Sequence, residues 1–250
     1  MGLKELFDLS GKTALVTGSS RGIGRGIALG LAEYGARLIL HGSRPSGALD
    51  ETLVLAQKLS PGSIAVTGDL SDPAQVDALP CDVDILVANA SIEAQMPWQE
   101  FALTEMRREY EVNSVATLRL FQRCYPHMKA RGWGRMMVVG SVQERRPHPM
   151  KIAYAASKGA QENMVRNIAR QVAAEGITVN NLCPGVFATD RNKYMYDDPA
   201  YEKAVLDAIP MHLVAEPIDA AGTAVLLASD AGRYITGATI VIDGGLSLPR

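Results

Sequence analysis

The sequence predicts an α/β protein with a doubly wound parallel sheet of about seven strands and helices on both faces. Three observations lead to this fold class. Short runs of β-branched and apolar residues alternate along the chain with longer stretches of helical periodicity. The short runs are apolar throughout, which is typical of strands covered on both faces. A glycine-rich turn follows the first run and precedes a helical stretch, as in a βαβ unit.

The elements follow one another regularly. The expected strands are residues 13–17, 37–41, 64–67, 84–88, 135–139, 177–182 and 239–242. The expected helices are residues 22–34, 48–59, 104–131, 152–175 and 217–228. The connection at 71–81 leaves room for little more than a short helix. Parallel strands joined in this way require right-handed crossovers. No linker rich in Pro, Gly or Ser interrupts the pattern, so we expect a single domain over residues 1–250.

The composition excludes several functional classes. Hydrophobic residues make up 47% of the 250 residues, and the formal net charge of -2 gives no general attraction to nucleic acid or anionic membranes. No run approaches the roughly 20 apolar residues of a membrane span, and the first residues lack the apolar stretch of a secretion signal. Cys81, Cys124 and Cys183 are far apart, without a CxxC. We therefore expect a cytoplasmic protein with buried thiols, no metal site and a small-molecule substrate.

The turn after the first strand reads TGSSRGIG over residues 17–24. Gly18 permits a tight turn, Gly22 lets the backbone approach a pyrophosphate, and Gly24 lets the helix pack closely on the sheet. The start of that helix offers free N–H groups and the positive end of a dipole to phosphates. The spacing is GxxxGxG in place of the more common GxGxxG. A turn that binds nothing is the alternative, but its place between a strand and a helix favours nucleotide binding.

Tyr154 and Lys158 form a YxxxK motif in a helical stretch. The i,i+4 spacing places both side chains on one helix face. A free tyrosine has a pKa of about 10, and a nearby ammonium would lower it. A tyrosine tuned in this way could supply the proton that a carbonyl needs when it accepts a hydride. By itself the motif also fits an ordinary surface pair, so its weight comes from the glycine-rich turn upstream.

Together these motifs resemble the short-chain dehydrogenase/reductase family. The matching residues span nearly the whole chain: TGxxxGIG at 17–24, Asn89-Ala90, Asn113, Ser141, Tyr154 with Lys158, Pro184-Gly185 with Thr189, and Asp243-Gly244-Gly245. The resemblance implies a single-domain Rossmann-like fold with strand order 3-2-1-4-5-6-7, and often a homotetramer. The N-terminal part is similar to members of the gluconate 5-dehydrogenase type. Enoyl reductases of the family usually place six residues between Tyr and Lys, where this chain has three.

The resemblance also assigns catalytic roles. Tyr154 would be the acid/base, Lys158 would also hold the nicotinamide ribose, and Ser141 would bind the substrate oxygen. Ser141 fits this role from the residues alone, because it follows an apolar run at the carboxyl end of a strand. Asn113 would hold a water that connects Lys158 to solvent. The sequence alone would give Asn113 only a backbone contact within a helix.

The cofactor contacts expected from the resemblance cover most of one edge of the sheet. They are Gly18, Ser20, Arg21, Gly22, Ile23, Gly24, Ser43, Arg44, Asp69, Leu70, Asn89, Ala90, Tyr154, Lys158, Pro184, Gly185, Val186 and Thr189. Ser91 departs from the family, which has a glycine there. Asp69 would contact adenine, although a helix cap or turn aspartate is nearly as good an interpretation.

The second strand ends without a carboxylate. NAD-specific members usually have an acidic residue near Gly42 that accepts the ribose 2′-hydroxyl. Here the residues are Ser43 and Arg44, with Arg21 in the glycine-rich turn. Because arginine attracts a 2′-phosphate, the sequence favours NADP, with NAD still possible.

Two segments are expected to border the substrate. Residues 190–212 are expected to form a mobile lid, or else a packed surface helix. In the loop after Ser141, either Arg145 or Arg146 is expected to point inward, with Glu144 neutralising the other, or the loop lies at a subunit contact. These features favour a ketone or secondary alcohol of a polar sugar, polyol or sugar acid. A 3-oxoacyl thioester reductase is the runner-up, and a non-catalytic nucleotide sensor with this fold is a more distant alternative.

Overall fold

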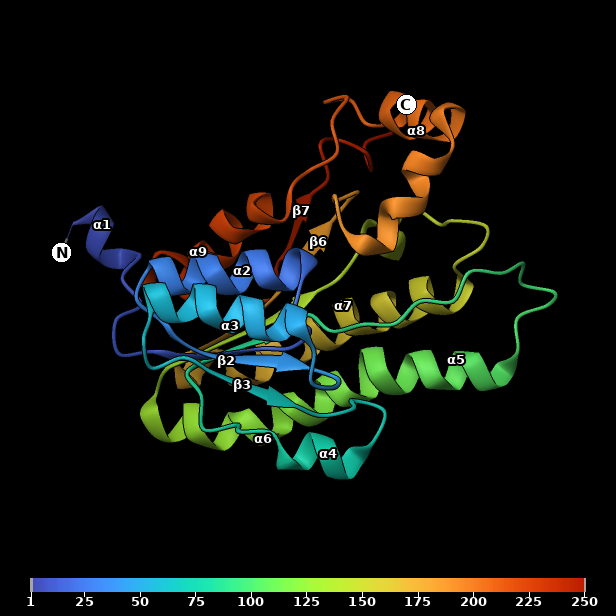
Figure 1. Cartoon of the computed structure of the whole chain (residues 1–250). Helices are drawn as coiled ribbons and strands as arrows, with labels where there is room; N and C mark the ends of the chain where they lie inside the picture. The colour runs from blue at the N-terminus through green and yellow to red at the C-terminus, as the bar shows by residue number, and fades with distance from the viewer. Residues whose placement is uncertain (1, 250) are drawn as a thin grey trace.

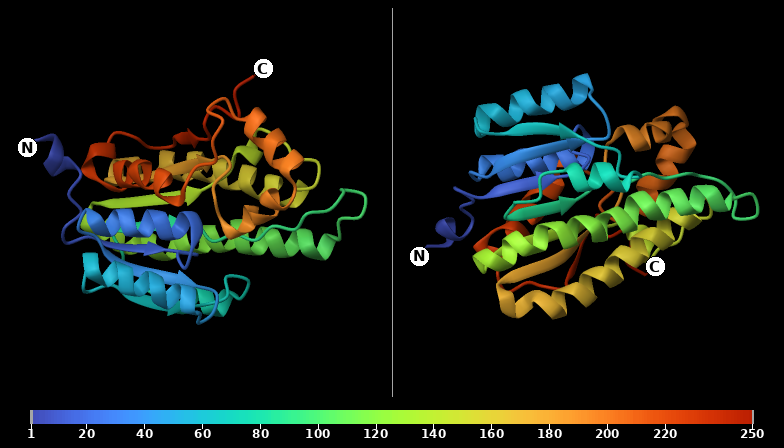
Figure 2. Two further views of the ribbon diagram at one scale, coloured as in Figure 1. Left: turned by 45° about the horizontal axis from the view of Figure 1, so that its top comes forward. Right: turned by 90° about the horizontal axis from the view of Figure 1, so that it is seen from below.

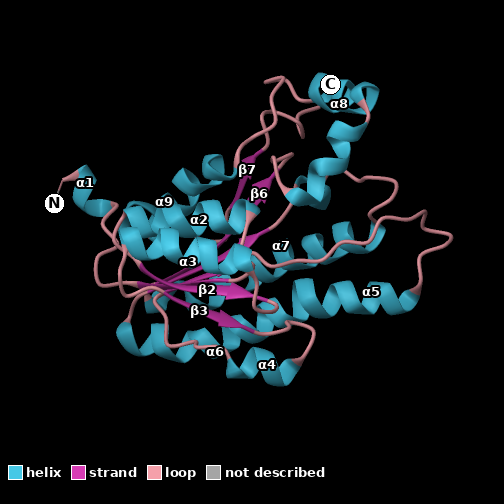
Figure 3. Ribbon diagram, in the orientation of Figure 1, coloured by secondary structure: helices cyan, strands magenta, loops and turns pink. Residues whose placement is uncertain are grey.

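The computed structural model describes residues 2–249, and its centre is a seven-stranded parallel sheet (Figures 1 and 3). The strands are β1 (Thr13–Val16), β2 (Arg37–Gly42), β3 (Ile64–Thr67), β4 (Ile85–Ala88), β5 (Gly134–Val139), β6 (Ile177–Pro184) and β7 (Thr239–Ile242). They lie in the order β3-β2-β1-β4-β5-β6-β7, and every neighbouring pair is parallel. The predicted fold class, strand number and strand order are confirmed.

Two apolar cores lie on the two faces of this sheet. Ala14 and Val16 of β1 belong to one core, and Leu15 between them belongs to the other. The same alternation recurs in β2, β4 and β5. Successive side chains of a strand point to opposite faces, so a strand covered on both sides needs apolar residues at every position. This explains why the strand segments read as continuous apolar runs.

Each face is covered by its own set of helices (Figure 2). One face carries α2 (Gly22–Glu33), α3 (Gly47–Leu59) and α9 (Ala221–Ala228); the other carries α4 (Pro73–Ala78), α6 (Ala116–Arg131) and α7 (Ile152–Val172), with α5 (Leu103–Tyr110) packed on α7. A short α1 (Leu3–Leu6) precedes the sheet, and α8 (Pro199–Ala208) lies beyond its carboxyl end, near the C-terminus (Figure 1). Within residues 2–249, no helix is both long and apolar enough to cross a membrane.

The predicted helix at 104–131 changes its winding in the middle. Between α5 and α6, residues Glu111–Val115 form a π-helical turn. Such turns often occur at functional sites, because the extra residue breaks the regular pattern of side-chain directions. Asn113 lies in this turn and is fully buried. The predicted helix at 152–175 is confirmed as α7, followed by a 3₁₀ turn at Ala173–Glu175.

Candidate active site

A cavity of about 1040 Å³ lies at the carboxyl ends of the strands and holds most of the predicted site residues. Those that line it are Gly18, Ser20, Arg21, Gly22, Ile23, Gly24, Ser43, Asp69, Leu70, Asn89, Ala90, Ser141, Tyr154, Lys158, Pro184, Gly185, Val186 and Thr189. Two predicted residues do not line it. Arg44 is exposed next to Ser43, and Asn113 is buried behind the wall.

The glycine-rich turn fits a dinucleotide. Gly18 and Gly22 have left-handed backbones, with φ of 63° and 56°. A Cβ at Gly24 would overlap both the Gly18 carbonyl oxygen and the Asn89 side chain. The helix α2 begins at Gly22, so its first N–H groups, which have no partner inside the helix, face the cavity. The turn is thus packed so closely against the protein that Gly18 and Gly24 leave no room for a Cβ.

Side chains from neighbouring strands fix this turn. The Asn89 amide donates to the carbonyl oxygens of Thr17 and Gly18, at 2.9 and 3.1 Å. His41, which the sequence reasoning missed, is buried at the end of β2. Its Nε2 lies 2.9 Å from the Gly68 carbonyl oxygen, and its Nδ1 accepts from the Gly18 N–H at 3.3 Å. A histidine inside an apolar strand was the available signal for this role.

Two of the charged residues expected around the adenosine end, Asp69 and Arg21, are engaged with the protein itself. The Asp69 carboxylate accepts from the backbone and hydroxyl of Ser71, and these hydrogen bonds lower its pKa. Asp69 is thus a turn aspartate that also lines the cavity. Arg21, in the glycine-rich turn, pairs with Asp190 at the start of the 3₁₀ segment Asp190–Asp197, at 2.9 Å. Arg44 stays outside the cavity wall, within one residue of Ser43.

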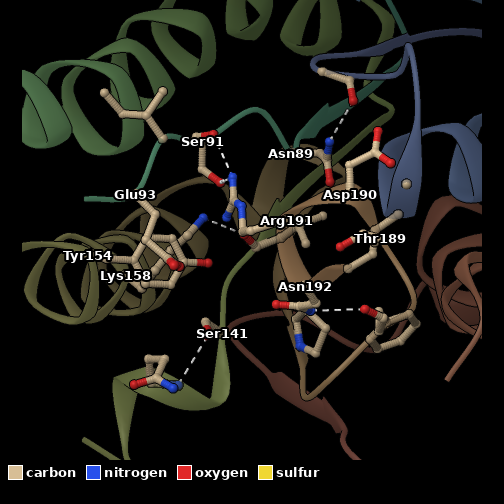
Figure 4. A pocket seen from close by; sticks show the side chains of 18 of the residues that line it. Asn89, Ser91, Glu93, Ser141, Tyr154, Lys158, Thr189, Asp190, Arg191 and Asn192 are labelled. Atoms are coloured by element: carbon tan, nitrogen blue, oxygen red, sulfur yellow. Dashed lines mark hydrogen bonds between the residues drawn. The ribbon is translucent and has the colours of Figure 1, made fainter. Parts of the chain in front are cut away.

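Three of the four catalytic residues predicted from the sequence meet at the other end of the cavity (Figure 4). Ser141 follows β5, while Tyr154 and Lys158 come from α7. The Ser141 hydroxyl accepts from the Gln143 N–H at 3.2 Å, and its interaction with Tyr154 opposes the rise in the Tyr154 pKa. The Lys158 Nζ donates to the Val139 carbonyl oxygen at 2.7 Å and lies 5.6 Å from the centre of the Tyr154 ring. The arrangement brings a hydroxyl pair and an amine to one wall.

The electrostatics differ from the expectation that Lys158 lowers the pKa of Tyr154. Burial raises the pKa of Tyr154 and lowers that of Lys158 to about 7. The cation that opposes the rise for Tyr154 is Arg191, whose guanidinium lies 5.6 Å from the Tyr154 ring centre. The expected lowering by Lys158 is therefore wrong for this structure, because desolvation outweighs it and reduces the charge of the lysine itself.

Arg191 also contacts the residue that departs from the family motif. It donates to the backbone oxygen of Ser91 at 2.7 Å and to the Ser91 hydroxyl at 3.1 Å (Figure 4). The 3₁₀ segment that begins here, Asp190–Asp197, leads into α8. Tyr194 and Tyr201 of this region line the cavity, with ring centres 6.0 Å apart. The predicted lid segment thus borders the site directly.

Asn113 lies behind the cavity wall and binds the segment that forms it. Its side-chain oxygen accepts from the Ile92 N–H at 2.9 Å, and its amide donates to the Ile92 carbonyl oxygen and the Ser157 hydroxyl, both at 3.0 Å. The Asn113 side chain is therefore engaged with the Ile92 backbone and the Ser157 hydroxyl. A water held by Asn113 remains a prediction.

The loop after Ser141 corrects a second expectation. Glu144 does not neutralise an arginine; its carboxylate accepts from the Ser141 N–H at 3.0 Å and from the Asn181 amide. Burial raises the pKa of Glu144 to about 7. Arg145 is exposed and pairs with Glu162, while Arg146 lines the cavity. Arg146 is exposed as well as lining the cavity, so an inward-pointing arginine stays a prediction, and the partner of Arg145 comes from α7.

Residues 18–247 match the family model described as enoyl-(acyl carrier protein) reductase. The chain belongs to the short-chain dehydrogenase/reductase family. As a member it is an oxidoreductase of the kind that acts on CH–OH groups, which confirms the resemblance seen in the motifs. Among the described residues, no group of three or more His, Cys, Asp or Glu could hold a metal ion.

Full-length relatives of this dehydrogenase/reductase have several substrates. Glucose 1-dehydrogenase of Gluconobacter oxydans is 35% identical over 96% of this chain and 93% of the relative. The solved structure of a 3-oxoacyl (acyl-carrier-protein) reductase from Agrobacterium tumefaciens, with NADP bound, has a TM-score of 0.91 and 36% identity over 98% and 97% of the two chains. Gluconate 5-dehydrogenase from Burkholderia cenocepacia, in complex with NADP and tartrate, has a TM-score of 0.90 and 31% identity over 100% of both chains.

Proposed function

We propose that this protein interconverts a ketone and a secondary alcohol with NADP(H), on a polar sugar, polyol or sugar-acid substrate. The observation that carries the proposal is the continuous cavity that runs from the glycine-rich turn to Tyr154. At its far end Ser141, Tyr154 and Lys158 line the cavity together, and Tyr154 shares α7 with Lys158.

Each catalytic side chain has a distinct task in this proposal. The nicotinamide, when bound, supplies the hydride for reduction or accepts it in oxidation. Ser141 donates a hydrogen bond to the substrate oxygen, and Tyr154 gives that oxygen its proton. Because burial raises its pKa, Tyr154 stays protonated at neutral pH, as a proton donor must. Lys158 holds the nicotinamide ribose and is within reach to support the charge change on Tyr154.

The preference for NADP rests on the end of β2. Ser43 lines the cavity there, and no carboxylate follows the strand that would repel a 2′-phosphate. Arg44 is one residue away and exposed, so its flexible side chain is free to reach a phosphate at the cavity mouth. Both solved relatives described above contain bound NADP, which supports the same choice.

The substrate half of the cavity favours a polar ligand. Gln143, Arg146 and His148 line it from the loop after Ser141, and Tyr194 and Tyr201 line it from the proposed lid over residues 190–212. Amide, guanidinium, imidazole and phenol groups form hydrogen bonds with hydroxyls and carboxylates, whereas an acyl chain offers them no partner. A 3-oxoacyl thioester remains the second candidate substrate, because a relative at 36% identity is named 3-oxoacyl (acyl-carrier-protein) reductase.

An activity screen tests this proposal. Purified protein is assayed with NADPH and NADH against keto sugars, keto acids and an acetoacetyl thioester. We expect NADPH-dependent reduction of a keto sugar or keto acid to be the fastest reaction. Faster turnover of the thioester would favour the second candidate. NADPH binding without turnover of any ketone would indicate a nucleotide-sensing protein.

We also propose a homotetramer, as in many relatives, built through α7 and the neighbouring α6. Leu118 of α6 and Ile152 of α7 are exposed apolar side chains on these helices, at 36% and 46%. Sedimentation at micromolar concentration should give four times the chain mass. A monomeric mass would reject the proposal.

A further inference from the structure

A buried ion pair lies in the cavity wall and has no part in the mechanism above. Glu93 follows β4, Lys151 immediately precedes α7, and both line the cavity. The Lys151 Nζ lies 2.9 Å from a Glu93 carboxylate oxygen. The two side chains are only 10% and 5% exposed, for Lys151 and Glu93 respectively. Neither residue belongs to a motif that the sequence analysis singled out.

The backbone on both sides of Glu93 is held in place. Asn113 binds both the N–H and the carbonyl oxygen of Ile92, and the Glu109 carboxylate accepts from the Ala94 N–H at 2.6 Å. Asn113 and Glu109 are both buried on the α5–π turn segment. Glu93 therefore projects from a segment whose neighbours are fixed, so the position of its carboxylate is preorganised.

Lys151 is fixed relative to the catalytic tyrosine. It immediately precedes α7, and its carbonyl oxygen accepts from the Ala155 N–H at 2.9 Å in the first turn. Tyr154 lies three residues further along the same helix. Burial is the largest influence on the pKa of Tyr154, followed by Arg191, and the negative charge of Glu93 comes next and raises it. Figure 4 shows Glu93 beside Tyr154 and Lys158. The pair thus lies within electrostatic reach of the reacting centre.

A gain in folding stability does not explain why this ion pair is buried in the wall. Removing two charges from water costs several kcal/mol per ion, and apolar replacements of buried pairs are often equally stable. Its hydrogen-bonding chemistry is more informative. An ammonium only donates and a carboxylate only accepts, whereas a hydroxyl does both. A hydroxyl can therefore bridge the two groups. A methylene can bind neither, and a second carboxylate would be repelled by Glu93.

We propose that Glu93 and Lys151 together bind a hydroxyl on the substrate carbon next to the reacting carbon, and so select α-hydroxy ketones and vicinal diols. This inference rests on the proposed function and narrows its substrate class. The hydroxyl donates to the Glu93 carboxylate and accepts from the Lys151 ammonium. A 3-oxoacyl thioester has a methylene at that position and would leave both charges without a ligand partner.

Two ketones that differ by one hydroxyl test the pair. The kcat/KM for acetoin is divided by that for butanone, each with saturating NADPH. The proteins are the wild type, Glu93→Gln, Lys151→Met and the double variant. We expect the wild type to prefer acetoin by about tenfold or more, because a hydrogen bond to a charged group is at stake. In every variant the ratio should fall towards one. The double variant leaves no unpaired buried charge, so it should keep the fold even where a single variant fails.

A second ion pair provides matched controls. Lys129 and Glu175 lie 2.8 Å apart on the surface, outside the cavity. Lys129→Met and Glu175→Gln make the same chemical changes as the test variants, and both should keep the wild-type ratio. Melting temperature and NADPH fluorescence titration check folding and cofactor binding for every protein. Glu93→Asp keeps the negative charge but shortens the side chain by one methylene. It replaces the double variant as the test if that variant does not fold, and its ratio of kcat/KM for acetoin to that for butanone should also fall.

The outcomes separate this inference from the proposed function. A folded double variant that still prefers acetoin as strongly as the wild type overturns the inference, while its ketone reduction continues to support the proposed function. A wild type with equal kcat/KM for acetoin and butanone would also overturn the inference and leave the proposed function standing. A wild type that binds NADPH but reduces no ketone overturns both. A ratio that collapses only in the Glu93 and Lys151 variants supports the pair as a specificity determinant.

Discussion

The two ends of the cavity are built from different parts of the chain. At the cofactor end, glycines and backbone N–H groups form the wall, and Asn89 and His41 hold the turn in place. At the substrate end, the wall consists of charged and hydroxyl side chains from several segments, among them the Glu93–Lys151 pair. Phosphates are bound by shape and by backbone donors, which leaves few alternatives to glycine. The substrate end depends on which side chains meet there, so it can vary within one fold.

The largest expected effect comes from one hydroxyl at the substrate end. Tyr154→Phe should reduce turnover by about 10²–10⁴-fold, because it removes the proton donor. The melting temperature and the affinity for NADPH should stay near wild type, since the glycine-rich end is unchanged. Steady-state kinetics and fluorescence titration measure the two effects. Tyr125→Phe, which removes a hydroxyl bound to Glu175 outside the cavity, is the control. Wild-type turnover in Tyr154→Phe would exclude its catalytic role.

The cofactor end should respond to a single added methyl group. In Gly24→Ala the new Cβ overlaps Gly18 and Asn89, so we expect a loss of roughly 1–3 kcal/mol of unfolding free energy and weaker NADPH binding. Urea unfolding measures the first effect. Gly222→Ala is the matched control, because a Cβ there meets nothing within 4 Å, and it should stabilise α9 by up to about 1 kcal/mol. Equal stability of the two variants would show that Gly24 is not needed for close packing.

Arg44 tests whether the cofactor end also uses a charge. Arg44→Ala should weaken NADPH binding by about tenfold and leave NADH binding nearly unchanged, because only NADPH carries the 2′-phosphate. The expected loss of NADPH affinity is only about tenfold because Arg44 lies outside the cavity wall. Lys58→Ala, at the far end of α3, controls for a general loss of positive charge. Equal losses for both cofactors would show that Arg44 does not bind the phosphate.

The smallest effect is a pH shift at Glu144. Burial raises the pKa of this carboxyl from 4.5 to about 7, so the folded state binds its proton more tightly than the unfolded state. The wild type should therefore lose stability as the pH rises from 4.5 to about 7, and Glu144→Gln should not show this loss. Chemical unfolding across this range measures the difference.

The same variant should change catalysis in a predictable direction. The Glu144 charge contributes to the raised pKa of Tyr154, after burial, Arg191 and other groups. Removing it should move the acid limb of alcohol oxidation to lower pH, by less than about one pH unit, because oxidation needs the ionised tyrosine. A shift to higher pH would contradict this electrostatic link. Gln keeps an oxygen that can accept from the Ser141 N–H, so the position of Ser141 is preserved.

The sequence by itself determined the fold and the glycine-rich turn of the cofactor end, but not the role of His41 in holding that turn. Continuous apolar runs predict strands covered on both faces, and the glycine positions follow from what a tight turn and a close helix require of the backbone. These requirements are local, so they can be read over a few residues. Tyr154, Lys158 and Ser141 could be placed in the same way, since a helix spacing and a strand end put them on the ligand side.

Only the tertiary structure decided how charges meet around the substrate. Arg191 reaches Ser91 across 100 residues of sequence, and Lys151 reaches Glu93 from a different loop. The expected partner of Arg145 was wrong for the same reason: Glu162 lies on α7, and Glu144 turns inward to Ser141. The effect of a buried charge on a neighbouring pKa depends on which charged groups face it and on how much water it has lost. Both conditions arise only when distant segments of the chain fold against one another.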